Sequence, residues 1–183
     1  MSEDPQESLD LFDDHEEVVS EDGKKVTRKG IYLLPNLLTT ASLFSGFFSI
    51  ISAINGNFIA SGMALFAAQM LDGLDGRVAR LTNSQSLFGA QYDSLCDVIS
   101  FGLAPAIIVF LWGLDSMGQA GWVFSFLYVA AAALRLARFN TYIGSEDTYF
   151  KGLPSPVASG MVVYFVWAMS SYGIQGEEVG AIL

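Results

Sequence analysis

The chain has 183 residues, of which 52% are hydrophobic and only 15% are charged, and its formal net charge is −10. Soluble domains are about one quarter charged, so this composition excludes an ordinary soluble domain. The single histidine, His15, and the single cysteine, Cys96, exclude a Cys/His zinc site, a disulfide framework and a Cys–His nucleophile pair. A metal ion bound by this chain would therefore have oxygen ligands, which suit Mg²⁺, Mn²⁺ or Ca²⁺.

The first 29 residues differ in composition from the rest of the chain. They hold ten of the 19 acidic residues and four of the nine basic ones. They also lack the apolar core of a secretory signal. We expect residues 1–29 to form an acidic cytoplasmic tail without ordered structure, and residues 30–183 to form one transmembrane domain.

Long uncharged stretches dominate the remainder of the chain and predict membrane spans. These stretches cover residues 30–71, 98–114, 116–134 and 152–175. In chain order, the predicted spans are residues 37–54, 58–80, 87–114, 122–139 and 153–172, and a further apolar run begins at 180–183. The predicted fold class is therefore all-α, a polytopic transmembrane helix bundle with at least five spans and a sixth beginning at the C-terminal end.

Basic residues predict the orientation of these spans. A cluster of Lys and Arg at 24–29 precedes the first span and, by the positive-inside rule, places the N-terminus in the cytoplasm. If the successive spans then cross the membrane in alternating directions, all nine Lys and Arg lie on the cytoplasmic side. This agreement is independent of how the spans were chosen, because only the first cluster was used to orient them.

Acidic residues at the cytoplasmic ends of the second and third predicted spans are the main functional signal. They are Asp72, Asp75, Asp93 and Asp97. A carboxylate at the centre of a membrane helix costs about 2.5–3.5 kcal/mol on insertion scales, and less near the interface. Helical spacing puts each pair on one helix face, so two antiparallel helices would gather four carboxylates around one pocket. The nearby Arg77 and Arg80 cannot neutralise four acids, which favours a bound divalent metal.

Small residues share the helix faces that carry these aspartates. Gly76 and Ala79 lie beside the first pair, and Gly89 lies beside the second. Missing side-chain volume next to the acids predicts room for a flat or bulky ligand. Close helix packing is the alternative explanation for these small residues.

The aspartates and small residues together resemble a known family signature. Asp72-x-x-Asp75-Gly76-x-x-Ala79-Arg80, eight further residues and then Gly89-x-x-x-Asp93-x-x-x-Asp97 is similar to the complete motif of the CDP-alcohol phosphotransferases. The resemblance implies an integral membrane enzyme that transfers a substituted phosphoryl group from a CDP-linked donor to an alcohol and releases CMP.

The resemblance also implies roles for individual residues. Asp72, Asp75 and Asp93 would hold divalent metal, Mn²⁺ or Mg²⁺, and Asp97 would lie near a second ion and act as the general base. Binding of the CDP donor would involve Asn36, Asp72, Gly76, Ala79, Arg80, Gly89 and Asp93. For Asn36, at the start of the first span, a helix cap is the alternative role.

Three flanking segments bear on the acceptor. Residues 34–39, 134–140 and 152–156 resemble the bacterial membrane-bound phosphatidylserine synthases, a subgroup of the same family. This resemblance implies CDP-diacylglycerol and L-serine as substrates, a homodimer, and a place in the bacterial inner membrane with the active site facing the cytoplasm. The residues expected to bind serine are Arg135, Arg138, Asn140 and Lys151. For the basic residues, contact with lipid phosphates is the alternative.

Two other functions stay open from the sequence. A related family enzyme could use glycerol phosphate or inositol phosphate, although a phosphorylated acceptor would favour more basic residues than the cytoplasmic loops provide. A small membrane transporter could use the same aspartates as a cation site or proton relay. The transporter alternative gives no reason for the small residues beside the acids.

Overall fold

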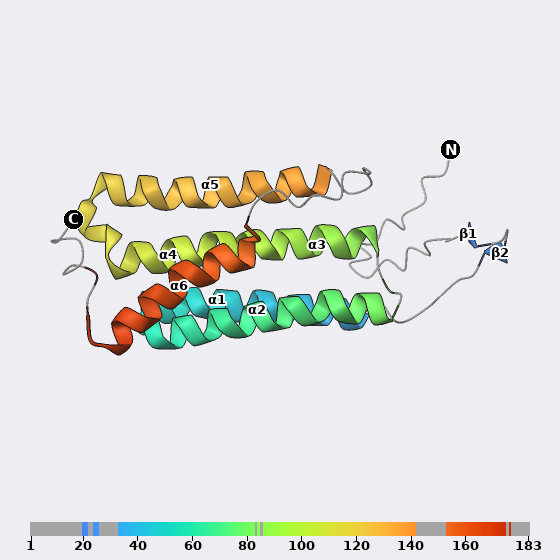
Figure 1. Ribbon diagram of the computed structural model, residues 1–183, viewed down its shortest axis with the longest axis horizontal. Helices are drawn as coiled ribbons and strands as arrows, with labels where there is room; N and C mark the ends of the chain where they lie inside the picture. The colour runs from blue at the N-terminus through green and yellow to red at the C-terminus, as the bar shows by residue number, and fades with distance from the viewer. Residues whose placement is uncertain are drawn as a thin grey trace, which may run out of the picture. The chain divides into compact units, whose positions relative to one another are not determined.

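A computed structural model describes residues 20–21, 24–25, 33–82, 84, 86–141, 153–174 and 176 (Figure 1). The chain divides into two units, Met1–Ile31 and Tyr32–Leu183. In the first unit, β1 (Ser20–Glu21) pairs with β2 (Lys24–Lys25) in antiparallel fashion, with Glu21 opposite Lys24. Most of the acidic tail lies outside the described residues, so its expected lack of ordered structure stays a prediction.

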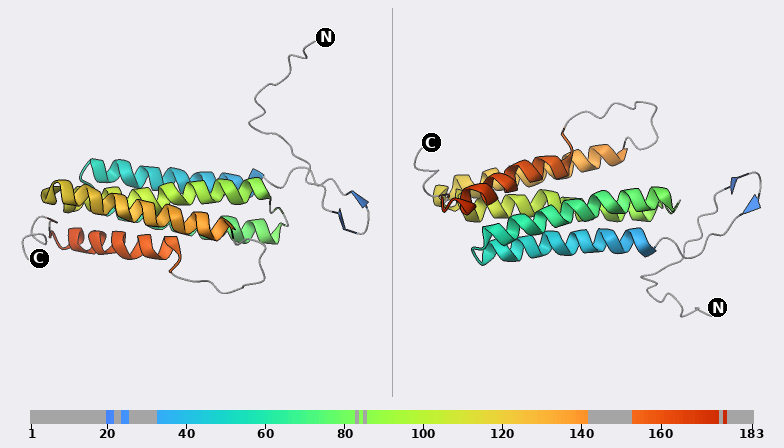
Figure 2. Two further views of the ribbon diagram at one scale, coloured as in Figure 1. Left: turned by 90° about the horizontal axis from the view of Figure 1, so that it is seen from above. Right: turned by 60° about the horizontal axis from the view of Figure 1, so that its bottom comes forward.

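The second unit is helical and follows the predicted spans closely. In chain order, its elements are α1 (Leu33–Ile54), α2 (Phe58–Leu81), α3 (Leu87–Asp97), the π-helical η1 (Val98–Leu103), α4 (Ala104–Trp112), the 3₁₀-helical η2 (Leu114–Met117), α5 (Gln119–Thr141) and α6 (Ser155–Ser171). In Figure 1, α1 and α2 lie at the lower edge, α3 and α4 across the middle and α5 at the upper edge. Helix α6 packs mainly against α2 and, to a lesser extent, against α4 (Figure 2). The all-α class therefore fits the structure.

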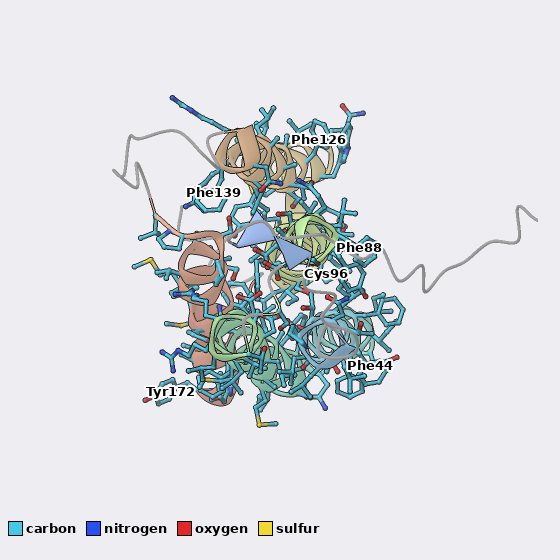
Figure 3. The ribbon with its side chains drawn as sticks, turned by 90° about the vertical axis from the view of Figure 1, so that its right-hand side faces the viewer. Phe44, Phe88, Cys96, Phe126, Phe139 and Tyr172 are labelled. Atoms are coloured by element: carbon cyan, nitrogen blue, oxygen red, sulfur yellow. The ribbon has the colours of Figure 1, made fainter. Side chains whose placement is uncertain are left out.

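Within the described residues, three helical stretches are long and apolar enough to cross a membrane. They are Leu34–Ile54, Phe88–Trp112 and Gln119–Asn140. The count of five or more spans stays a prediction, and the apolar run at 180–183 lies outside the described residues. Large apolar side chains such as Phe44, Phe126 and Tyr172 point away from the bundle (Figure 3), as expected where lipid is the solvent.

Serine hydroxyls hold α1 and α2 together as a hairpin. Three α1 serines donate to carbonyls of α2: Ser42 to Ala68 (2.9 Å), Ser45 to Ala64 (2.7 Å) and Ser49 to Ser61 (2.8 Å). Small polar residues allow close helix approach in lipid and add interhelical hydrogen bonds. The hairpin turn contains Gly56, whose φ of +73° lies in the region that glycine adopts without steric cost.

A proline interrupts the third predicted span. Pro105 has no backbone N–H, so the carbonyl of Phe101, four residues earlier, loses its usual helical partner. The helix widens there into η1, where the N–H of Ala104 bonds to the carbonyl of Ile99, five residues back. The Tyr128 hydroxyl of α5 donates a long hydrogen bond, 3.4 Å, to the Phe101 carbonyl. The sequence analysis predicted one span here and did not predict this interruption.

The centre of the bundle is closely packed. Leu65, Phe101, Ile108 and Val163 are fully buried in one apolar cluster. At Gly46, an added Cβ would lie 2.8 Å from the Ser100 Cβ, so the backbone of α1 passes directly against η1. The close crossing of α1 and η1 fixes α1 beside the helix that carries Asp93 and Asp97.

Candidate active site

The four predicted aspartates come from two successive helices: Asp72 and Asp75 lie in the C-terminal half of α2, Asp93 lies within α3, and Asp97 is the last residue of α3. Among the described residues, Asp72, Asp75 and Asp93 each offer a carboxylate oxygen, and these oxygens lie within 4.8 Å of one another. The side chain of Asp97 lies close to that of Asp72. The structure therefore gathers three carboxylates tightly and places the fourth beside them.

Local sequence explains why the chain reverses at this point. The Thr82 hydroxyl donates to the Val78 carbonyl at 2.7 Å, in the last turn of α2. The side chain of Ser86 caps the next helix by accepting a hydrogen bond from the Gly89 N–H at 2.9 Å. Two helix ends separated by a few residues thus place Asp75 and Asp93 on neighbouring helices.

The cluster has the chemistry of a site for a hard divalent cation. Asp75 is 5% exposed, and the Oδ1 atom of Asp93 is buried with no hydrogen-bond partner among the described residues. A buried carboxylate oxygen without a partner is costly, and several close carboxylates repel one another. Carboxylate oxygens are among the ligands that Mg²⁺ and Mn²⁺ prefer. The residues present therefore fit a divalent metal.

The predicted donor-binding residues lie around this cluster in two kinds of environment. At Gly76, the nearest described atom to an added Cβ would be the Arg80 Nη2, at 3.9 Å, so the backbone borders open space. At Gly89, an added Cβ would lie 3.1 Å from the Ser86 Oγ and 3.4 Å from the Asn36 Oδ1. Gly76 thus has the room expected for a ligand, whereas Gly89 permits close packing against α1.

Arg80 and Ala79 complete the set of residues that the sequence predicts to bind the donor. The Arg80 Nε donates to the carbonyl of Gly76 at 3.1 Å, and the side chain is exposed at the end of α2. Ala79 is half-buried on the same helix. The Arg80 guanidinium is therefore held over the Gly76 turn, next to the open space.

The residues predicted to bind serine are only partly placed near the aspartates. Asn140, at the end of α5, accepts a hydrogen bond from Ser94, the neighbour of Asp93, at 3.2 Å. Arg135 donates to the Ser155 Oγ at the start of α6, at 2.7 Å. Arg138 is exposed on the last turn of α5, and Lys151 lies outside the described residues.

The sequence analysis missed one residue that touches the carboxylates. The Thr39 hydroxyl of α1 donates to the Asp75 Oδ2 at 2.6 Å. The available signal was the adjacent pair of hydroxyl residues Thr39-Thr40 in an uncharged helix, but nothing in the spacing shows which neighbour they face.

Comparison with known proteins identifies the family. The family model described as CDP-alcohol phosphatidyltransferase matches residues 32–182. The chain belongs to this family. The matched range contains all four aspartates and every other residue that the sequence analysis assigned to the site.

Relatives in the family carry related names. A CDP-diacylglycerol–serine O-phosphatidyltransferase of Helicobacter pylori is 45% identical over 143 residues, covering 78% of this chain and 60% of the relative. One of Mycobacterium tuberculosis is 36% identical over 159 residues, covering 82% and 55%. An archaetidylserine synthase of Methanothermobacter thermautotrophicus is 39% identical over 144 residues, covering 78% and 60%. The chain thus spans about 60% or less of the length of these relatives.

Proposed function

We propose that the protein transfers the phosphatidyl group of CDP-diacylglycerol to the hydroxyl of L-serine, giving phosphatidylserine and CMP. The observation that carries this proposal is the cluster of Asp72, Asp75 and Asp93 within a complete family signature. The names of the relatives support CDP-diacylglycerol and serine as the substrate pair. Family membership also removes the support for a cation transporter.

Asp72, Asp75 and Asp93 would hold one divalent ion, Mn²⁺ or Mg²⁺, and Asp97 would join Asp72 at a second. When bound, such ions neutralise the pyrophosphate oxygens of the donor and the charge that develops on departing CMP. The Oδ1 of Asp93, which is buried without a hydrogen-bond partner among the described residues, supports this assignment, because burial of an unpaired carboxylate oxygen is costly.

Asp97 is the proposed general base. It lies one turn beyond Asp93 on the same helix face and outside the three close carboxylates. The serine hydroxyl oxygen forms a bond to the phosphorus of the phosphatidyl group, and the bond from that phosphorus to the CMP oxygen breaks. The proton of the serine hydroxyl moves to the Asp97 carboxylate, which must lie within hydrogen-bond reach of it.

The remaining site residues would bind and orient the two substrates. Gly76 and Ala79 leave space for the cytidine, Arg80 lies beside the phosphates, and Asn36 and Gly89 close the α1 side. The serine carboxylate needs a cation, for which Arg135, Arg138 and Lys151 are proposed, with Asn140 as a hydrogen-bonding partner. The Ser94–Asn140 hydrogen bond supports this placement, because it joins the end of α5 to the helix that carries Asp93.

The proposed setting is the bacterial inner membrane, with at least five spans, a cytoplasmic N-terminus and the active site at the cytoplasmic surface. The distribution of Lys and Arg supports this orientation. A homodimer is proposed from family resemblance. A donor dissolved in the bilayer explains why the aspartates lie at the ends of membrane helices.

An acceptor comparison tests the proposal. Purified protein in lipid vesicles is given CDP-diacylglycerol, Mn²⁺ or Mg²⁺, and serine, glycerol phosphate or inositol phosphate in parallel, and CMP release is measured. We expect serine to support the fastest release. Faster release with glycerol phosphate or inositol phosphate would assign the chain to a sister activity, and no release with any acceptor would contradict the proposed chemistry.

A further inference from the structure

The spacing of the two acidic helices depends on α1. Within the described residues, α1 packs along α2 and also against α3, whereas α2 and α3 make few backbone contacts with each other (Figure 2). The carboxylates of Asp75 and Asp93 come from these two weakly contacting helices, yet their oxygens lie within 4.8 Å. Something other than direct α2–α3 packing must therefore fix their separation.

Thr39 on α1 contacts the acidic face of α2. It is 5% exposed, and its Oγ1 lies 2.6 Å from the Asp75 Oδ2 and 3.1 Å from its own helix carbonyl at Pro35. A hydroxyl has one hydrogen to donate, and the carboxylate is both the nearer acceptor and the charged one. Hydrogen bonds to a charged acceptor are shorter and stronger than neutral ones. The Thr39 hydroxyl thus orients the Asp75 carboxylate.

The next residue, Thr40, contacts α3. Its Oγ1 lies 2.7 Å from the Asn36 carbonyl and 2.9 Å from the Tyr92 hydroxyl. A carbonyl can only accept, so the Thr40 hydrogen goes to Asn36 and Tyr92 donates to Thr40. The Tyr92 ring stacks on Phe88, with ring planes 6° apart, which limits its rotation. Tyr92 immediately precedes Asp93, so this contact holds the acidic turn of α3.

We propose that Thr39 is a positioning residue of the metal site and that the Thr39-Thr40 pair braces the two acidic helices. Thr39 fixes the Asp75 carboxylate, and Thr40, through Tyr92, fixes the turn of α3 that carries Asp93. This inference rests on the proposed function, because it assigns the ordered carboxylates to a divalent cation. Partners that orient metal ligands typically change metal affinity or activity by about 10- to 100-fold when they are removed.

Ser42 provides a matched control. It lies on the same helix three residues later, is 2% exposed, and donates to the Ala68 carbonyl of α2 at 2.9 Å. Like Thr39, it supplies one buried hydroxyl across the α1–α2 interface, but its acceptor is a backbone carbonyl. If the Thr39 contact serves helix packing alone, Thr39→Val and Ser42→Ala will have the same consequences.

The experiment measures Mn²⁺ binding to the purified full chain by electron paramagnetic resonance, without lipid substrate, together with melting temperature and steady-state CMP release. We expect Thr39→Val to weaken Mn²⁺ binding about 10- to 100-fold. Thr39→Ser, which keeps the hydroxyl, should restore wild-type affinity. Ser42→Ala should lower the melting temperature and leave Mn²⁺ affinity unchanged.

The outcomes separate this inference from the function on which it rests. Unchanged Mn²⁺ affinity in Thr39→Val, or an equal loss in Ser42→Ala, overturns the positioning role. If Thr39→Val does not fold, Tyr92→Phe decides the question, since it removes the hydrogen bond to Thr40 and unchanged affinity there also overturns the brace. Wild-type protein that binds Mn²⁺ but releases no CMP contradicts the proposed function, while the Mn²⁺ titrations still decide the role of Thr39.

Discussion

The aspartates of the site divide by their surroundings, although all four are the same residue type. Asp72, Asp75 and Asp93 share one small volume, whereas Asp97 lies outside that set of three and beside Asp72. Removing one of the three close carboxylates should weaken binding of a divalent cation. Removing Asp97 leaves these three carboxylates in place, so a substitution at Asp97 should have a different consequence from one at Asp72.

Asp97→Asn should slow turnover strongly while leaving binding of the CDP-diacylglycerol donor in place. The amide cannot accept the serine proton as a carboxylate does, and loss of a general base typically costs about 10²–10⁴-fold in rate. Steady-state CMP release and binding of CDP-diacylglycerol in the presence of Mn²⁺ are the two measurements. Near-normal turnover would remove Asp97 as the base.

Asp72→Asn should instead lose metal and donor binding together. Asp72 belongs to the three-carboxylate group and also contacts Asp97, so its removal takes one charge from the shared volume. Mn²⁺ titration and donor binding to the same purified variant provide the check. Wild-type Mn²⁺ affinity in this variant would contradict the assigned ligand set.

Sequence reasoning reached the aspartates because their relation is local. Helical spacing fixes which face carries Asp72 and Asp75, and the polar residues 82–86, between the second and third predicted spans, predict that the chain reverses before Asp93. The contact between Thr39 and Asp75 spans 36 positions and depends on how α1 is rotated against α2, which no local spacing encodes. The position of Asn140 beside Ser94 likewise requires the packed bundle.

At the scale of the element, the most informative feature is the widened turn η1 between α3 and α4. Hydropathy predicted the length of this span but not the break, since Pro105 is apolar and does not interrupt an uncharged run. The break matters for the site because Asp97 is the last residue of α3. The widened turn therefore begins immediately after the last of the four aspartates.

A double-mutant cycle tests the cause of this turn. Tyr128→Phe should destabilise the protein by about 0.5–1.5 kcal/mol, because it removes the hydroxyl that satisfies the Phe101 carbonyl. In a Pro105→Ala background the new N–H can bond to that carbonyl, so the same Tyr128→Phe change should cost less. Unfolding free energies of the four proteins measure the coupling. Equal costs in both backgrounds would show that the Tyr128 hydroxyl does not compensate for the proline.

At the scale of the whole molecule, charge is distributed unevenly along the chain. All ten acidic residues of the N-terminal tail lie within residues 1–22, whereas residues 23–183 have nine acidic and nine basic residues. The family match begins at residue 32. The strongly acidic composition is therefore a property of the tail, and composition alone describes the site-bearing part poorly.

Removal of residues 1–22 should leave turnover unchanged. None of the residues assigned to the site lies in this segment, and the basic cluster at 24–29 that orients the first span is retained. CMP release by the shortened and full-length proteins, at equal amounts in vesicles, is the measurement. A large loss of activity would assign the tail a role in catalysis or insertion.

The serine contacts between α1 and α2 have a consequence for biosynthesis. Every one of these bonds joins residues that precede Leu81, so the hairpin contains its own interhelical partners before α3 has been synthesised. Chains acquire structure from the N-terminus as they are made. The hairpin is thus equipped to leave the insertion machinery as a pair, carrying Asp72 and Asp75 into the membrane surface ahead of the helix that completes the site.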